Sequence, residues 1–119
     1  MRNENLKERT RSFALRVIRL TEALPKGRTA DVIGKQLLRS GTSVGANYRA
    51  ACRPKSSADF IAKMSIVEEE ADESIYWMEL LIESGLMNQE RMEELLKEAN
   101  ELLAIVVASI KTAKGNKAK

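Results

Sequence analysis

The chain has 119 residues and a formal net charge of +3, and 44% of its residues are hydrophobic, 31% are charged and only 4% are aromatic. This composition excludes a disordered chain and is typical of one helical domain with a modest core. The sequence contains no His, which removes the commonest general base and the usual zinc ligand and so excludes several classes of enzyme.

Two helices are predicted in the first half of the chain, over about residues 5–24 and residues 29–53. The apolar face of the first helix consists of Phe13, Val17, Leu20 and Leu24. Thr29 is the expected N-cap of the second helix, and Pro54 stops it. The second helix contains three glycines, Gly34, Gly41 and Gly45. Because each weakens a helix by about 1 kcal/mol relative to Ala, we expect either close packing or a local bend there.

Two more helices are predicted in the second half. The third opens with Ser56 and Asp59, which have the spacing of a capping box, and Gly85 is its natural C-cap. Its apolar residues alternate by four and three, and they are Phe60, Met64, Val67, Ala71, Ser74, Met78 and Leu81. This period indicates a long helix that packs at a shallow angle. The fourth helix starts after Asn88, another favourable cap.

The three predicted connections are short, so consecutive helices should run antiparallel. We therefore predict an all-α fold, an up-down-up-down four-helix bundle over residues 1–113. Residues 114–119 are polar and basic and are expected to form a flexible tail. The single cysteine, the polar N-terminus and the absence of any apolar run near the roughly 20 residues of a membrane span favour a cytoplasmic protein without membrane contact.

Two polar rows on the second and third helices are expected to meet. The rows have spacings of three and four, and they consist of Arg39, Ser43 and Asn47, and of Glu70, Glu73 and Trp77. We expect a partly buried structural network that joins Arg39 and Asn47 to the two glutamates under the ring of Trp77, because buried polar groups need partners. The alternative is a solvated acidic face beside an ordinary helix rich in serine and glycine.

Three segments of the chain together resemble the signature of a known family. They are Leu38-Arg39-Ser40-x-x-Ser43-Val44-x-Ala46-Asn47-Tyr48-Arg49, Ser57-x-Asp59-Phe60-Ile61 and Glu70-x-x-Glu73-x-x-Tyr76-Trp77-Met78. They are similar to those of small bacterial four-helix-bundle proteins that are often encoded by intervening sequences of 23S ribosomal RNA genes. The resemblance implies a left-handed up-down bundle, a ring-shaped homo-oligomer that is commonly a pentamer, and no known catalytic activity. A more distant similarity is to the accessory proteins of diversity-generating retroelements, pentameric bundles that bind a reverse transcriptase and nucleic acid.

Charge is strongly separated along the chain. Residues 1–55 contain 13 Lys or Arg and 4 Asp or Glu, whereas residues 56–119 contain 7 and 13. The candidate nucleic-acid contacts crowd the first helix, and they are Arg2, Lys7, Arg9, Arg11, Arg16 and Arg19. Arg9 and Arg16 are seven residues apart and share a face, so a basic stripe there can follow RNA or DNA phosphates with little sequence selectivity. The alternative is that these arginines pair with acidic residues of the same or a neighbouring subunit, or are only solvated.

The candidate partners are nucleic acid, further copies of the chain and other proteins. Five apolar residues lie away from the main seam and suggest burial against another subunit, and they are Ile61, Ile66, Ile75, Tyr76 and Ile82.

Glu70 and Glu73 could act as acid and base or hold a divalent metal, but no His, phosphate-binding loop or activated nucleophile accompanies them. We therefore expect no enzyme, metal or cofactor. The predicted function is a self-assembling scaffold or adaptor that binds RNA or DNA, with a protein-binding module as the alternative.

Overall fold

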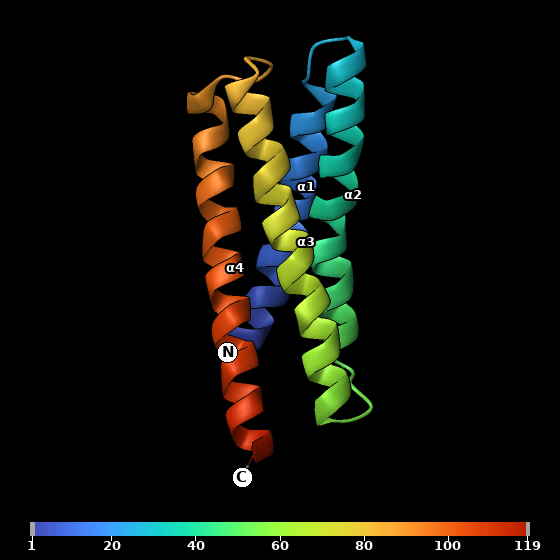
Figure 1. Cartoon of the computed structure of the whole chain (residues 1–119), viewed down its shortest axis with the longest axis vertical. Helices are drawn as coiled ribbons and strands as arrows, with labels where there is room; N and C mark the ends of the chain where they lie inside the picture. Colours follow the sequence, from blue (N-terminus) through green and yellow to red (C-terminus); the bar gives the residue numbers. More distant parts are fainter. Residues whose placement is uncertain (1, 119) are drawn as a thin grey trace.

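The computed structural model describes the backbone of residues 2–118 and the side chains of residues 5–116. The described residues form four helices, α1 (Arg2–Glu22), α2 (Arg28–Ala51), α3 (Ser57–Glu83) and α4 (Gln89–Ala118). The chain reverses direction at each of the three connections, so consecutive helices lie antiparallel (Figure 1). Because α4 packs against both α3 and α1, the bundle closes into a ring of four helices. The predicted all-α bundle is confirmed, and its left-handed sense stays a prediction.

The core follows the apolar spacing of each helix. Its largest fully buried side chains come from all four helices, and they include Phe13, Leu37, Met64, Met78, Leu81, Met92 and Leu102. Burial of a side chain of this size contributes about 1.5–3 kcal/mol relative to exposure, so this cluster fixes how the helices lie against one another. Within residues 2–118, no helix is both long enough and apolar enough to cross a membrane.

The ends of α3 are fixed as the sequence predicts. Ser56 is the N-cap, and its hydroxyl accepts a hydrogen bond from the backbone N–H of Asp59 at 3.0 Å. At the other end, Gly85 has a φ of 80° and lets the N–H of Leu86 bond the carbonyl of Leu81 at 3.0 Å. This bond is the hallmark of the Schellman motif, in which glycine is favoured because the turn needs a positive φ.

Two predicted boundaries differ from the structure. Thr29 is not the cap of α2, because the helix begins at Arg28 and its N-cap is Gly27, which has a φ of 152° and offers no side-chain bond. The positive φ of Gly27 turns the chain directly into the helix, and its carbonyl accepts the N–H of Asp31 at 3.0 Å. At the C-terminal end, α4 continues to Ala118, beyond residue 113 where we expected the bundle to end.

Candidate functional site

The helix α2 packs closely on α1 through its glycines. A Cβ atom added at Gly41 would lie 2.9 Å from both methyl carbons of Val17, a separation that real Cβ contacts essentially never show. A Cβ atom added at Gly45 would lie 3.3 Å from the carbonyl oxygen of Thr10. Of the two explanations that the sequence left open for these glycines, close packing is therefore the one that the structure supports.

A groove with a volume of about 490 Å³ lies between α1 and α2. Its charged lining residues are Lys7, Glu8 and Arg11 from α1, Arg49 from α2 and Arg53 from the connection that follows α2. The rest of its lining consists of small residues, Thr10, Ala14, Thr42, Gly45 and Ala46. Because these side chains are short, they leave space between the cations of α1 and the two arginines at and after the end of α2.

The groove carries mainly positive charge that is available to solvent. Lys7, Arg11, Arg49 and Arg53, here called the groove cations, are all exposed. Within residues 5–116, none of them forms an ion pair, and Glu8 is the one carboxylate of the lining. Four neighbouring charges of one sign attract an anion, and the attraction weakens as salt rises.

Sequence reasoning missed the contribution of α2 to this groove. The candidate contacts were sought on the first helix, whereas Arg49 was noted only in the family signature and in the basic half of the chain, and Arg53 only in the basic half. The signal that could have found them is their spacing, because Gly45, Arg49 and Arg53 follow one another at intervals of four residues. This spacing places Arg49 on the side of α2 whose glycines contact α1, and Arg53 lines the same groove from the connection that follows the helix.

The cations predicted on α1 divide between two sides of the helix. Lys7 and Arg11, four residues apart, line the groove. Arg9 instead contacts α4, where its Nε and Nη2 donate to the two carboxylate oxygens of Glu98 at 3.0 and 2.7 Å. Its Nη2 also donates to Glu101 at 2.9 Å. The hydrogen bond with Glu98, aided by Glu101, raises the pKa of Arg9 above its usual value, so this charge is held within the bundle.

The prediction that Arg9 and Arg16 form an available basic stripe is therefore wrong. Arg9 pairs with acidic residues of the same chain, which is the alternative that the sequence left open. Arg16 is half-buried and Arg19 is exposed, and neither lines the groove nor forms an ion pair among residues 5–116. The side chain of Arg2 lies outside the described residues.

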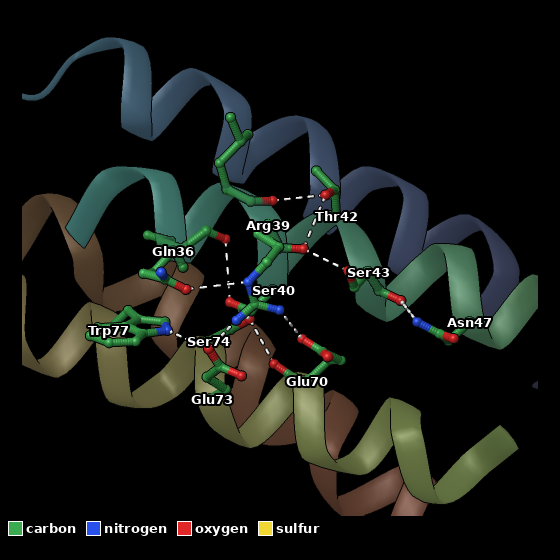
Figure 2. A network of polar contacts seen from close by, with 12 residues as sticks. Gln36, Arg39, Ser40, Thr42, Ser43, Asn47, Glu70, Glu73, Ser74 and Trp77 are labelled. Carbon is green, nitrogen blue, oxygen red and sulfur yellow. Dashed lines mark hydrogen bonds and ion pairs between the residues drawn. The ribbon is translucent and has the colours of Figure 1, made fainter. Parts of the chain in front are cut away.

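A second polar cluster joins α2 to α3, and Figure 2 shows it from close by. Arg39 donates to Glu70 at 3.1 Å and forms an ion pair with Glu73. The indole N–H of Trp77 donates to the same carboxylate of Glu73 at 2.9 Å. Tyr76 packs edge-on against Trp77, with the ring centroids 5.0 Å apart. The structure thus brings together four of the six residues that the sequence places in a network.

Ser43 and Asn47 do not reach the carboxylates (Figure 2). The hydroxyl of Ser43 donates to the carbonyl of Arg39 at 2.7 Å, and the amide of Asn47 donates to the carbonyl of Ser43 at 2.8 Å. The prediction that joined Asn47 to Glu70 and Glu73 is therefore wrong. Its physical reason is that short polar side chains on a helix can bond the carbonyl four residues earlier on the same helix.

Two buried serines complete this side of α2 and were not predicted. The hydroxyl oxygens of Ser40 and Ser74, both fully buried, lie 2.9 Å apart, and Ser74 also donates to the carbonyl of Glu70 at 2.8 Å. The signal that could have found the pair is a serine at an apolar seam position on each helix. No buried side-chain nitrogen or oxygen among the described residues lacks a partner. The cluster is thus satisfied within the fold and holds α2 against α3.

The apolar face expected on α3 is smaller than the sequence suggests. Ile75 is buried in the core, and Ile61 and Ile82 are partly buried against it. Ile66 and Tyr76 remain exposed, by 41% and 53%. Further exposed apolar residues on the first two helices are Leu15, Ile18, Val32 and Leu38.

Among the described residues, no group of three or more His, Cys, Asp or Glu is placed to hold a metal ion.

Two comparisons with known proteins cover nearly the whole chain. The family model described as 23S rRNA-intervening sequence protein matches residues 2–108. The chain is also similar to the crystal structure of a protein of unknown function from the S23 ribosomal protein family of Bacteroides thetaiotaomicron. The two are 38% identical with a TM-score of 0.87, and the alignment covers 93% of this chain and 99% of that chain. No protein with curated annotation matches the chain significantly.

Proposed function

We propose that this chain, which belongs to the 23S rRNA-intervening sequence protein family, is a non-catalytic, self-assembling scaffold or adaptor that binds RNA or DNA through its basic surface. The observation that carries the proposal is the groove between α1 and α2, where four exposed cations have no acidic partner among residues 5–116. Contacts to phosphates supply affinity with little sequence information. The proposal places the protein in the cytoplasm, where its single cysteine stays reduced.

The first experiment measures binding of RNA and DNA by the purified protein, at known oligomer mass, over a series of salt concentrations. We expect binding that falls steeply with salt. Arg11→Gln should weaken it, because Arg11 lines the groove. Arg9→Gln is the matched control, because its charge is already engaged by Glu98 and Glu101. An absence of binding at low salt, or equal losses in both variants, would count against the basic surface as the binding site.

Self-assembly is the second part of the proposal. Apolar side chains remain exposed on three helices of the bundle, and they are Leu15 and Ile18 on α1, Val32 and Leu38 on α2, and Ile66 and Tyr76 on α3. The basic first half and the acidic second half of the chain also allow one copy to attract another. We expect a ring of five subunits, as the resemblance implies, and light scattering after size exclusion measures the mass. A mass equal to the 13.3 kDa of one chain would contradict self-assembly.

A protein-binding module without nucleic-acid affinity is the alternative function. The exposed Tyr76, which packs against Trp77 beside the ion pairs of Arg39, favours it, because Tyr, Trp and Arg are enriched among the residues that dominate protein interfaces. The two functions differ in one measurement. A stable oligomer that binds neither RNA nor DNA at low salt supports the protein-binding module.

A further inference from the structure

We infer that the α1–α2 groove binds the phosphate backbone of a double-helical nucleic acid in preference to a single strand. The inference rests on the proposed function, because it specifies the site and the class of ligand within it. Three properties of the groove carry the inference, and they are the arrangement of its cations, the size of its other side chains and the absence of aromatic residues from its lining.

The groove cations form two short rows on adjacent segments. Lys7 and Arg11 belong to α1, and Arg49 and Arg53 lie at the end of α2 and directly after it. Four residues correspond to about 6 Å along a helix, so Lys7 and Arg11 present two charges about one turn apart. Arginine can also bind phosphate oxygens through two parallel hydrogen bonds. A phosphate backbone in the groove would thus be contacted from two sides.

The small residues between the rows keep the groove accessible. Ala14 of α1 and Gly45 and Ala46 of α2 contribute no side chain beyond a methyl group. A backbone can approach a surface of this kind closely, whereas long side chains would hold it away. The site can therefore be blocked without removing a single charge, by enlarging a small residue.

No aromatic residue lines the groove, although Tyr48 and Phe60 line a neighbouring pocket that shares Lys7 with it. The aromatic residues of the chain are Phe13, Tyr48, Phe60, Tyr76 and Trp77. Phe13 and Tyr48 are buried, and the exposed Tyr76 belongs to α3, which packs on another side of α2. Proteins that bind single strands gain about 1–3 kcal/mol per base from stacking on aromatic side chains. A duplex needs no such partner, because its bases already stack on one another, and it carries one charge per about 1.7 Å of its axis.

The number of cations sets the expected salt dependence. Four phosphate contacts on B-DNA give a slope of about −3.6 in a plot of log affinity against log salt, or a roughly 150-fold loss between 50 and 200 mM salt. If two of the four contacts are removed, the loss falls to roughly 12-fold over the same interval. The slope therefore reports how many groove cations touch phosphate.

The test measures filter binding of a DNA duplex of about 20 base pairs, two helical turns, and of an oligo-dT strand of the same length. We expect the duplex to bind at least about tenfold more tightly at equal salt. The double variant R49Q/R53Q should weaken duplex binding. It should also make the plot of log affinity against log salt less steep, by about 2. The control K26Q/R28Q removes the same charge from exposed residues at the other end of α2, and it should leave the slope unchanged.

Two further variants separate the groove from general surface charge. Ala46→Leu keeps every charge but fills space between the basic rows, and because position 46 is exposed on a helix, the fold should tolerate it. We expect it to weaken duplex binding by about tenfold, with an unchanged circular dichroism spectrum and oligomer mass. Among residues 5–116, Glu8 is the one carboxylate of the lining, and Glu8→Gln should tighten binding.

The outcomes distinguish this inference from the proposed function. If neither nucleic acid binds at low salt, both are overturned. If nucleic acid binds but the single strand equals the duplex, or R49Q/R53Q and K26Q/R28Q lose equally, only the inference is overturned. If R49Q/R53Q changes the oligomer mass instead of the affinity, the groove is a contact between copies of the chain, and the inference is again overturned.

Discussion

The two sides of α2 differ in whether their arginines are paired with acidic residues. Toward α3, Arg39 meets Glu70 and Glu73, so its charge is used within the fold. Toward α1, Arg49 lines a groove together with Arg11, and neither forms an ion pair among residues 5–116. The difference arises from the neighbouring helices, because α3 is acidic opposite Arg39 whereas α1 is itself basic. A cation that folding does not use is available to an external anion.

The largest effect is expected from packing on the α1 side. Gly41→Val places methyl groups where Val17 already lies, since even a Cβ atom at Gly41 would be 2.9 Å from it. Overpacking of a dense core costs about 1–3 kcal/mol, and we expect a loss near 3 kcal/mol in the free energy of unfolding by urea. The control is Ala50→Val at an exposed position of the same helix. Val17→Ala should partly rescue Gly41→Val, and equal losses in Gly41→Val and Ala50→Val would show that the helices do not touch there.

A smaller effect is expected from the paired cation on the α3 side. Arg39→Leu leaves Glu70 and Glu73 without their partner, but the side chain of Arg39 is 47% exposed, so solvent screens part of the interaction. We expect a loss of about 1 kcal/mol, or a fall of about 4 °C in Tm. Thermal unfolding followed by circular dichroism measures it. An unchanged Tm would remove the basis for calling this cluster structural.

Acid should weaken the start of α3 through Asp59. The hydrogen bond from the backbone N–H of Lys55, aided by that from the ammonium group of Lys63, holds the pKa of Asp59 below its ordinary value of 3.8. A carboxylate whose pKa is lowered by folding stabilises the protein above its ordinary pKa, and the contribution disappears as pH falls through the lowered value. Asp59→Asn should therefore reduce stability at neutral pH and approach the parent protein in acid. A difference that is constant between neutral pH and pH values below 3.8 would show that the carboxylate charge is not the cause.

The smallest effect on stability is expected from the groove. Arg49→Gln removes a charge without an acidic partner among the described residues, so the free energy of unfolding should stay within about 0.5 kcal/mol of the parent protein. Parallel urea titrations of Arg49→Gln and Arg39→Leu compare the two sides of α2 directly. Equal losses would abolish the distinction between a cation used by the fold and one available to a ligand.

The helices were predictable because local signals agreed with the tertiary structure. The seam of α3 repeats every three or four residues, and the caps Ser56, Gly85 and Asn88 mark the ends of helices as expected. The start of α2 was not predictable in this way, because a glycine with a positive φ replaced the expected polar cap at Thr29. The handedness of the bundle does not follow from apolar spacing, because either sense buries the same faces.

The site was only partly predictable, because it depends on which helix meets each side of α2. The pairing of Arg39 with Glu70 and Glu73 followed from opposite charge and helical spacing. Asn47 was misassigned because its own helix offered a carbonyl four residues away. The groove was missed because the sequence shows that Gly45 allows a close approach without showing that α1 is the helix that approaches.

The position of Trp77 makes the α3 side optically observable. Trp77 is the single tryptophan of the chain, and its indole binds Glu73 and lies beside Tyr76. Its fluorescence should shift when α3 separates from α2, which gives a signal for unfolding that needs no added dye. The groove lies on the other side of α2, between α2 and α1. A ligand bound in the groove should therefore leave the fluorescence emission of Trp77 unchanged. A change in emission on titration with duplex DNA would reveal communication through α2 from one side of the bundle to the other.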